Sequence, residues 1–187
     1  MPPQVKVTKE AIINAAVDIV RKNGVQAINA RTVASMLGCS TQPVFSNFAT
    51  MDDLRMAIAE KADALCRAYM QREVESGRFP IYKANGMAYI RFAKEEKELF
   101  KLLYMRDRSV EDASAEPEIT DEMETIVHHN TGLAGTDLKL FHLEMWAYVH
   151  GIATMFATGF LDLDWELVSK MLTDAYRGLR KQYGMGE

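Results

Sequence analysis

Residues 30–54, ARTVASMLGCSTQPVFSNFATMDDL, constrain the fold of this chain more than any other segment. Two short stretches with helical apolar spacing flank the turn Gly38-Cys39-Ser40, and a second break precedes a long helical stretch. Apolar residues fall where these helices would face inward, and small polar residues fall where they would face outward. This pattern is typical of a helix-turn-helix, which places its second helix in a DNA major groove.

Capping residues predict three short helices at the N-terminus. Thr8 is expected to cap the first helix, and Asn29 is expected to cap a second helix over about residues 30–37. Ser40 is expected to cap a third helix over about residues 41–48. The first 50 residues are therefore predicted to form a compact helix-turn-helix domain.

The rest of the chain is predicted to be helical as well. Thr50 and Asp53 have the spacing of a capping box at the start of a fourth helix that runs to about residue 76. Further helices are expected near residues 81–94, 96–107, 117–133, 136–159 and 164–183, with a polar loop at 108–116. Because no segment shows β alternation, we predict an all-α fold of about nine helices. Residues 51–187 would form a ligand-binding and dimerisation bundle that the long fourth helix joins to the head.

Composition limits the classes of protein that fit. The chain has 187 residues, of which 48% are hydrophobic, so it can bury a core, yet it contains no apolar run long enough to span a membrane. The N-terminus lacks the apolar region of a secretory signal. Two cysteines, Cys39 and Cys66, form no disulfide framework. Together these features predict a protein of the reducing cytoplasm.

Charge is unevenly distributed along the chain. The formal net charge is -4, but residues 1–50 carry five basic and two acidic side chains. The remaining 137 residues carry 17 basic and 24 acidic side chains. This distribution favours a nucleic-acid contact confined to the N-terminal head.

The predicted third helix carries the candidate base-reading residues. Gln42 can form a bidentate pair with adenine, and Thr41, Ser46 and Asn47 are short polar groups on the same outward face. A solvated helix face is the alternative, but such faces are usually rich in Lys and Glu, and this one has neither. We therefore expect double-stranded DNA as a partner and Gln42 as the main base reader.

Phosphate contacts are expected from few side chains. Arg31, Ser40 and Thr41 lie near the turn, and backbone N–H groups follow Thr50 at the start of the fourth helix. Lys6 and Lys9 would add charge. Since each neutralised phosphate contributes about -0.9 to the salt slope of binding, so few cations predict a modest slope.

The first 55 or so residues resemble the DNA-binding head of TetR-type transcriptional regulators. Many members of that family carry a tyrosine where this chain has Phe45 and a lysine where it has Met51, and both are usual phosphate contacts. The resemblance therefore implies that Phe45 faces DNA without a hydroxyl group. The match runs through Thr8, Ile12, Ala15, Ala16, Gly24, Ala34, Gly38, Ser40, Phe45, Phe48 and Leu54.

A second resemblance lies near the C-terminus. Residues 146–152, WAYVHGI, resemble the Trp-His-Gly signature of one class of C-terminal domain in the same family. The family resemblance implies a ligand cavity in the body and a homodimer built mainly from the last two helices. Small residues and an apolar stripe on those two helices also suit close packing, either with a second copy or within the chain.

Methionines and aromatic residues are abundant in the body and would suit the wall of an adaptable apolar pocket. The candidates for its lining are Phe100, Tyr104, Trp146 and His150, although core packing would explain each of them equally well. Arg91, Arg106 or Glu144 would orient a polar ligand group if they do not form surface ion pairs. The four histidines lack metal-binding spacing, so no metal or cofactor is expected.

These observations favour a ligand-responsive transcriptional repressor that binds a pseudo-palindromic operator as a homodimer and is released by a small molecule. An enzyme is the second hypothesis, but the chain contains no nucleophile motif, metal cluster or phosphate loop, so no catalytic residue is assigned. The third hypothesis is a ligand-binding or scaffold protein whose head binds DNA weakly or not at all.

Overall fold

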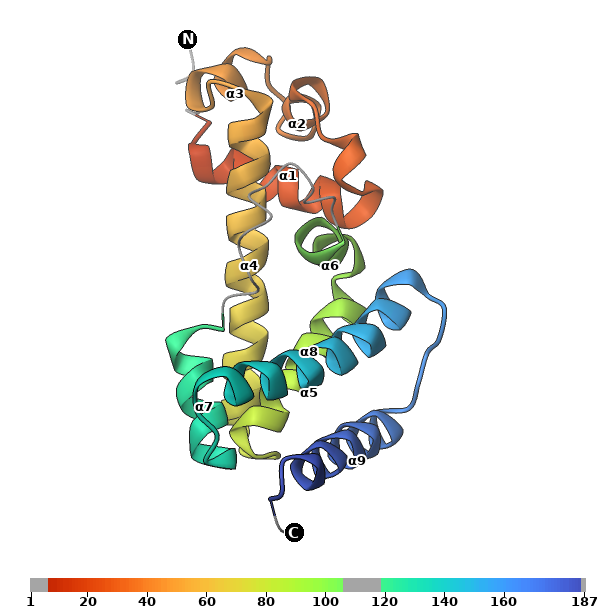
Figure 1. Cartoon of the computed structure of the whole chain (residues 1–187). Helices are drawn as coiled ribbons and strands as arrows, with labels where there is room; N and C mark the ends of the chain where they lie inside the picture. Colours follow the sequence, from red (N-terminus) through yellow and green to blue (C-terminus); the bar gives the residue numbers. More distant parts are fainter. Residues whose placement is uncertain (1–6, 106–118, 186–187) are drawn as a thin grey trace. The chain divides into compact units, whose positions relative to one another are not determined.

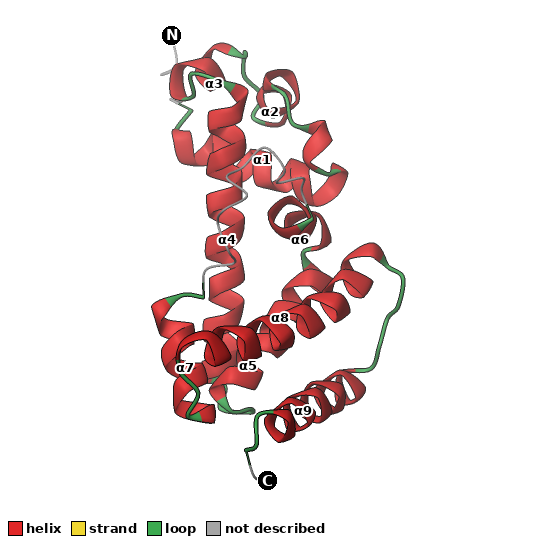
Figure 2. Ribbon diagram, viewed as in Figure 1, coloured by secondary structure: helices red, strands yellow, loops and turns green. Residues whose placement is uncertain are grey.

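The computed structural model describes residues 7–105 and 119–185 of the chain, and this part is helical without any strand (Figure 1, Figure 2). The described residues contain nine α-helices and one short 3₁₀ helix, which confirms the predicted all-α fold. Lys6, Arg106, the predicted loop at 108–116 and the start of the helix predicted at 117 lie outside the described residues. Within the described part, no helix is both long enough and apolar enough to cross a membrane.

The chain forms two compact units. The first unit combines Met1–Leu65 with Glu96–Arg106, and the second combines Cys66–Glu95 with Asp107–Glu187. The division therefore falls inside a continuous helix, α4 (Met51–Glu75), which contributes residues to both units. The domain boundary expected at residue 50 stays a prediction, because compactness alone does not identify independently folding domains.

The first unit is the N-terminal head together with a helix from later in the chain. Its apolar core includes Val33 of α2, Val44 of α3 and Phe100 of α6, all at most 1% exposed. The elements of this unit are α1 (Lys9–Asn23), η1 (Val25–Ala27), α2 (Ala30–Met36), α3 (Gln42–Asn47), the first turns of α4 and α6 (Lys97–Tyr104).

Side-chain caps begin these helices largely as expected. The Thr8 hydroxyl accepts a hydrogen bond from the Ala11 N–H at 3.1 Å, and Asn29 forms a capping box with Thr32. At the start of α4, Thr50 and Asp53 bond each other's backbone N–H, at 2.8 and 3.1 Å.

The cap expected for the third helix was wrong. Thr41, not Ser40, is the N-cap of α3, and no side chain caps this helix. The reason is that Thr41 already has helical backbone angles, φ -73° and ψ -15°, whereas a capping side chain usually belongs to an extended residue.

An ion pair ties α6 to α1 within the first unit. The Arg21 guanidinium donates two hydrogen bonds of 2.8 Å to the Glu96 carboxylate just before α6. This bidentate bond raises the pKa of Arg21. Gly24 ends α1 with φ +77°. The Glu98 carboxylate lies so close to Gly24 that a Cβ added to this glycine would stand 3.1 Å from Oε2.

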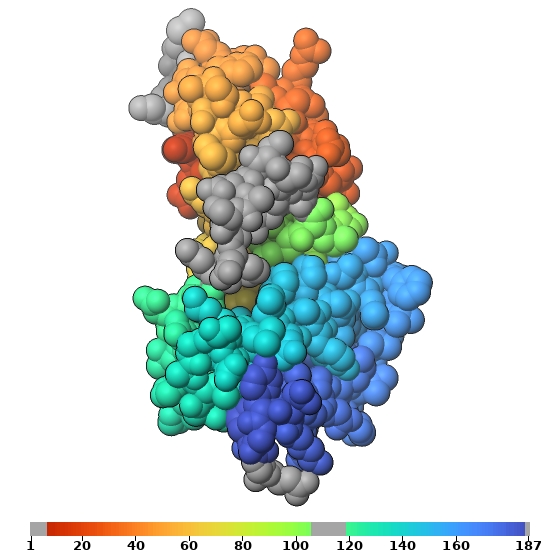
Figure 3. Space-filling model, in the orientation of Figure 1, coloured from red at the N-terminus to blue at the C-terminus, as the bar shows by residue number. Residues whose placement is uncertain are grey.

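The second unit is a helical bundle around α5 and α8, which pack along each other. Buried side chains from both helices, including Phe92 and Phe141, fill its core. Figure 3 shows the side chains of α7, α8 and α9 in this unit forming a continuous surface on the face in view. The remaining elements are α5 (Ile81–Glu95), α7 (Asp121–Thr131), α8 (Gly135–Thr158), α9 (Trp165–Gln182) and the last turns of α4.

Candidate nucleic-acid interface and ligand cavity

A tight turn joins α2 to α3 in the head. Gly38 has φ +64°, a left-handed conformation that glycine adopts without the strain of a side chain. The Cys39 N–H then donates to the Ala34 carbonyl at 3.0 Å and closes the end of α2. The sequence Gly38-Cys39-Ser40 therefore forms the turn that its composition predicts.

Helix α3 presents one apolar and one polar face. Val44 and Phe48 are buried on the side of α3 that packs against α1 and α2, whereas Gln42 and Ser46 are exposed. Phe45 is 56% exposed although it is a large apolar side chain. Of the four polar residues that the sequence places on the outward face, Gln42 and Ser46 are exposed, whereas Thr41 and Asn47 are half-buried.

Two of the polar residues on α3 are engaged with the helix itself. The Ser46 hydroxyl donates to the Gln42 carbonyl at 2.9 Å, and the Asn47 amide donates to the Pro43 carbonyl at 2.8 Å. The Gln42 side chain, in contrast, makes no hydrogen bond with another described residue. Base reading by Gln42, Ser46 and Asn47 stays a prediction, and the geometry leaves Gln42 the least committed of the three.

The expected phosphate contacts lie at helix starts. Arg31 is exposed in the first turn of α2, Ser40 is exposed in the turn, and Thr41 is half-buried at the start of α3. The Thr50 hydroxyl accepts a bond from the Asp53 N–H and caps α4. Lys9 places its ammonium group 5.2 Å from the centre of the Phe48 ring. The contacts of these residues with phosphate stay predictions.

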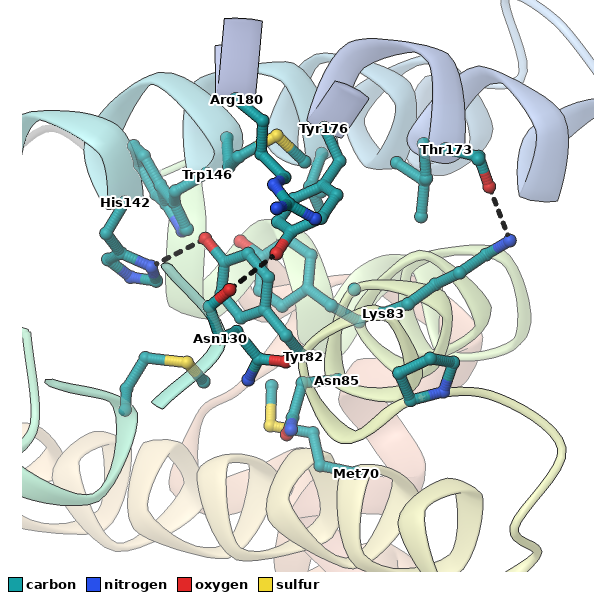
Figure 4. A pocket seen from close by; sticks show the side chains of 17 residues that line it. Met70, Tyr82, Lys83, Asn85, Asn130, His142, Trp146, Thr173, Tyr176 and Arg180 are labelled. Carbon is teal, nitrogen blue, oxygen red and sulfur yellow. Dashed lines mark hydrogen bonds between the residues drawn. The ribbon is translucent and has the colours of Figure 1, made fainter. Parts of the chain in front are cut away.

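The second unit contains a cavity of about 450 Å³ (Figure 4). Its volume falls in the range of small-molecule sites. Helices α4, α5, α7, α8 and α9 all contribute to its lining. The apolar part of the lining consists of Met70, Pro80, Gly86, Met123, Met145, Trp146, Val149 and Leu172.

Hydrogen-bonded pairs of polar residues line the same cavity. The Tyr82 hydroxyl lies 3.1 Å from His142 Nδ1, and the Tyr176 hydroxyl donates to the Asn130 carbonyl at 3.4 Å (Figure 4). Burial raises the pKa of Tyr82 and lowers the pKa of His142. The Tyr82–His142 bond therefore joins two neutral groups near pH 7.

Two cationic side chains, Lys83 and Arg180, also line the cavity. Lys83 donates to the Thr173 hydroxyl at 2.8 Å, and its ammonium group lies 4.9 Å from the centre of the Phe79 ring. Burial lowers the pKa of Lys83, and the nearby charge of Arg177 lowers it further. Among the described residues, no aspartate or glutamate lines this cavity.

The candidate pocket residues are divided between the two units. Trp146 lines the cavity. His150 does not line it but stacks on Trp146 at 4.8 Å between ring centres and lies 2.9 Å from the Tyr89 hydroxyl. Phe100 and Tyr104 belong to α6, which packs against α1 in the first unit, so the structure does not bring them to this cavity.

Most polar lining residues were not among the candidates. The sequence did not predict four of them, because each is equally compatible with a surface position: Tyr82, Lys83, Tyr176 and Arg180. The spacing of the polar residues on α9 could have indicated a shared wall of the cavity, since residues 173, 176 and 180 fall on one face of this helix. Arg91 and Glu144, which the sequence offered as polar ligand contacts, have other partners. Arg91 lies 3.9 Å from Glu73, and Glu144 accepts a hydrogen bond from Tyr183.

No group of three or more metal-ligating side chains converges anywhere in residues 7–105 and 119–185.

Three solved structures share this fold. A TetR-like transcriptional regulator from Rhodococcus sp. RHA1 matches with a TM-score of 0.67 and 15% identity, over 96% of this chain and 98% of its own. A TetR family member from Streptomyces coelicolor A3 matches with a TM-score of 0.60 and 18% identity, over 89% of this chain and 96% of its own. The multidrug binding protein EbrR, solved in complex with imidazole, matches with a TM-score of 0.58 and 18% identity, over 89% of this chain and 88% of its own.

Sequence comparison gives the family itself. No curated protein matches this chain. Residues 82–176, however, match the family model of the tetracyclin repressor-like C-terminal domain. This match covers half of the chain, including most of α5, all of α6, α7 and α8, and much of α9. The narrower Trp-His-Gly class stays a prediction from residues 146–152. The chain belongs to the TetR family of transcriptional regulators.

Proposed function

We propose that this regulator is a repressor that binds a pseudo-palindromic operator as a homodimer and is released when a small molecule fills the cavity of the second unit. The observation that carries the proposal is the combination, in one chain, of a helix-turn-helix with exposed polar residues on α3 and a cavity of about 450 Å³ lined mainly by residues of the matched C-terminal domain. No enzymatic step is assigned to either site.

Exposed apolar residues on α8 support the homodimer. Leu140 and Leu143 are 46% and 41% exposed on this helix, and Leu167 is 46% exposed on α9. Large apolar side chains that remain exposed to solvent favour association. A dimer is also what the operator requires, because half-sites about 34 Å apart need two recognition helices.

Helix α4 supports the coupling between ligand and DNA. It is one continuous helix of 25 residues that contributes to the core of the head through Leu54 and to the cavity lining through Met70. A ligand that favours one packing of the second unit would change the orientation of α4 and, in the dimer, the spacing of the two α3 helices. Repression would then be relieved because both half-sites can no longer be contacted together.

Replacement of Gln42 by alanine tests the DNA interface. With DNA from upstream of the protein's own operon, Gln42→Ala should weaken the specific gel shift by roughly 5- to 150-fold, the equivalent of about 1–3 kcal/mol for a lost bidentate base contact. Gln26→Ala is the matched control, because Gln26 is exposed in the same unit but lies outside α2 and α3. Its gel shift should equal that of the unmodified chain.

Failure of this experiment has a clear meaning. If the unmodified chain gives no specific shift even at low salt, the repressor proposal is wrong. A ligand-binding protein with a vestigial head would then be the better description, consistent with the exposed Phe45 and with Met51 where relatives carry phosphate-binding residues.

A further inference from the structure

Lys83, which lines the cavity, has different partners from two other lysines of the second unit. Lys94 and Lys170 each form a salt bridge with an aspartate, Asp162 and Asp174. Lys83, which lines the cavity, instead has a threonine hydroxyl and an aromatic ring as its partners among the described residues. The charge of Lys83 is therefore not balanced by a carboxylate within the described part of the chain.

The surroundings of Lys83 add positive charge and take away water. Arg180 lines the same cavity, and the charge of Arg177 acts on Lys83 from outside the lining. Partial burial, which removes some of the water around the ammonium group, is the main cause that lowers the pKa of Lys83. A cation in such a site attracts an anion more strongly than it would in water, because the effective dielectric constant is lower.

The remaining wall of the cavity is apolar and adaptable. Met70, Met123 and Met145 contribute flexible thioether side chains, and Trp146 contributes a flat ring that His150 supports by stacking. A volume of about 450 Å³ accommodates a body of the size of two fused aromatic rings together with a polar head.

We propose that the effector of this regulator is an amphipathic anion, with an apolar aromatic body against Met123, Met145 and Trp146 and a carboxylate head that accepts hydrogen bonds from Lys83. This inference rests on the proposed function in one respect, since it takes the cavity to be the effector site. The Thr173 hydroxyl accepts the bond from Lys83 Nζ at 2.8 Å and itself donates to the Ser169 carbonyl at 3.0 Å, so it positions the ammonium group. A cationic ligand is disfavoured, because it would meet the ammonium group of Lys83 and no aspartate or glutamate of the described lining.

Three probes with one body and different heads test the inference on the full chain: 2-naphthylacetate, 2-naphthylacetamide and 2-(2-naphthyl)ethylamine. Their dissociation constants are measured by calorimetry without DNA. The acid should bind at least tenfold more tightly than the amide and the amine, a difference of about 1.4 kcal/mol. Lys83→Met, which keeps the aliphatic stem, should abolish this preference and leave the affinity for the amide unchanged.

Two further variants keep the experiment decisive. Lys83→Arg retains the charge and should retain the preference for the acid. Lys97→Met removes the same charge from an exposed position on α6 in the first unit and should behave as the unmodified chain. Thermal unfolding of each variant shows that it is folded.

The inference is overturned if the amine or the amide binds as tightly as the acid, if Lys83→Met keeps the preference, or if none of the probes binds at about 1 mM. Any of these results leaves the repressor proposal standing, because the gel shift with and without Gln42→Ala is read in the absence of probes. Conversely, selective binding of the acid without any specific gel shift would contradict the repressor and support the anion site.

Discussion

At the scale of single residues, two tyrosine–histidine pairs join α5 to α8. Tyr82 meets His142 at 3.1 Å, and Tyr89 meets His150 at 2.9 Å. Burial lowers the pKa of both histidines from the ordinary value of 6.5. The folded chain therefore holds fewer protons than the unfolded chain at mildly acidic pH, so stability rises as the pH rises. The contribution of these two neutral histidines to the free energy of unfolding should be fully present above about pH 6.5. It should decrease as the pH falls toward the folded-state pKa values.

A substitution can assign this pH dependence to one pair. His142→Gln keeps a hydrogen-bond acceptor for Tyr82 but cannot be protonated, so the loss of melting temperature between pH 7 and pH 5 should be smaller than in the unmodified chain. His129→Gln is the control, because His129 is exposed on α7, and its variant should show the original loss. An unchanged pH dependence in His142→Gln would refute the role assigned to this histidine.

At the scale of helices, two glycines should respond to the same change in opposite directions. Gly86 lies inside α5, where an added Cβ would stand 3.4 Å from side-chain carbons of Val149 and Leu172, an ordinary contact distance. Gly86→Ala should stabilise the chain by up to about 1 kcal/mol through helix propensity. Gly24→Ala should destabilise it, because φ is +77° and the Cβ would press on the Glu98 carboxylate. Urea unfolding measures both, and the same sign for both variants would contradict this account.

The helices themselves were predictable because their signals are local. Thr8, Asn29 and Thr50 cap helices in the structure as their positions in the sequence suggest. The cap of α3 was not predictable in this way, because Ser40 and Thr41 are equivalent by composition and the backbone angles of Thr41 decide between them.

The cavity was only partly predictable because it depends on which helices face each other. The abundance of aromatic residues predicted Trp146, which lines the cavity, but the same reasoning predicted Phe100 and Tyr104, which belong to α6 in the first unit. Apolar spacing says that a helix has a buried face, not which partner covers it. Lys83 could not be recognised as a cavity residue until α5 and α9 were known to be neighbours.

At the scale of the whole molecule, assembly is the property to test. Leu143→Glu places a charge on the exposed apolar stripe of α8 and should turn a dimer into a monomer, because an unpaired charge in an interface is costly to desolvate. Light scattering during size exclusion measures the mass. The specific gel shift should weaken in parallel, since a monomer contacts one half-site.

The control for assembly is another exposed apolar residue. Met56 is 60% exposed on α4 in the first unit, so Met56→Glu adds the same charge away from α8 and α9. Its mass should equal that of the unmodified chain. If the unmodified chain is already a monomer at micromolar concentration, or if Leu143→Glu remains a dimer, the interface lies elsewhere.

The position of α6 also limits how this chain can be recombined with its relatives. Head and body are not consecutive segments, because Glu96–Arg106 belongs to the first unit although α5 precedes it and α7 follows it. A chimera that exchanges everything after Leu65 would give the head a foreign α6, and would replace the partner of Arg21 at Glu96 and the buried Phe100. Operator specificity should therefore be transferred between relatives only when α6 is exchanged together with the N-terminal head. A gene for such a chimera joins the two parental sequences at three positions, two more than a simple exchange of an N-terminal for a C-terminal half would need.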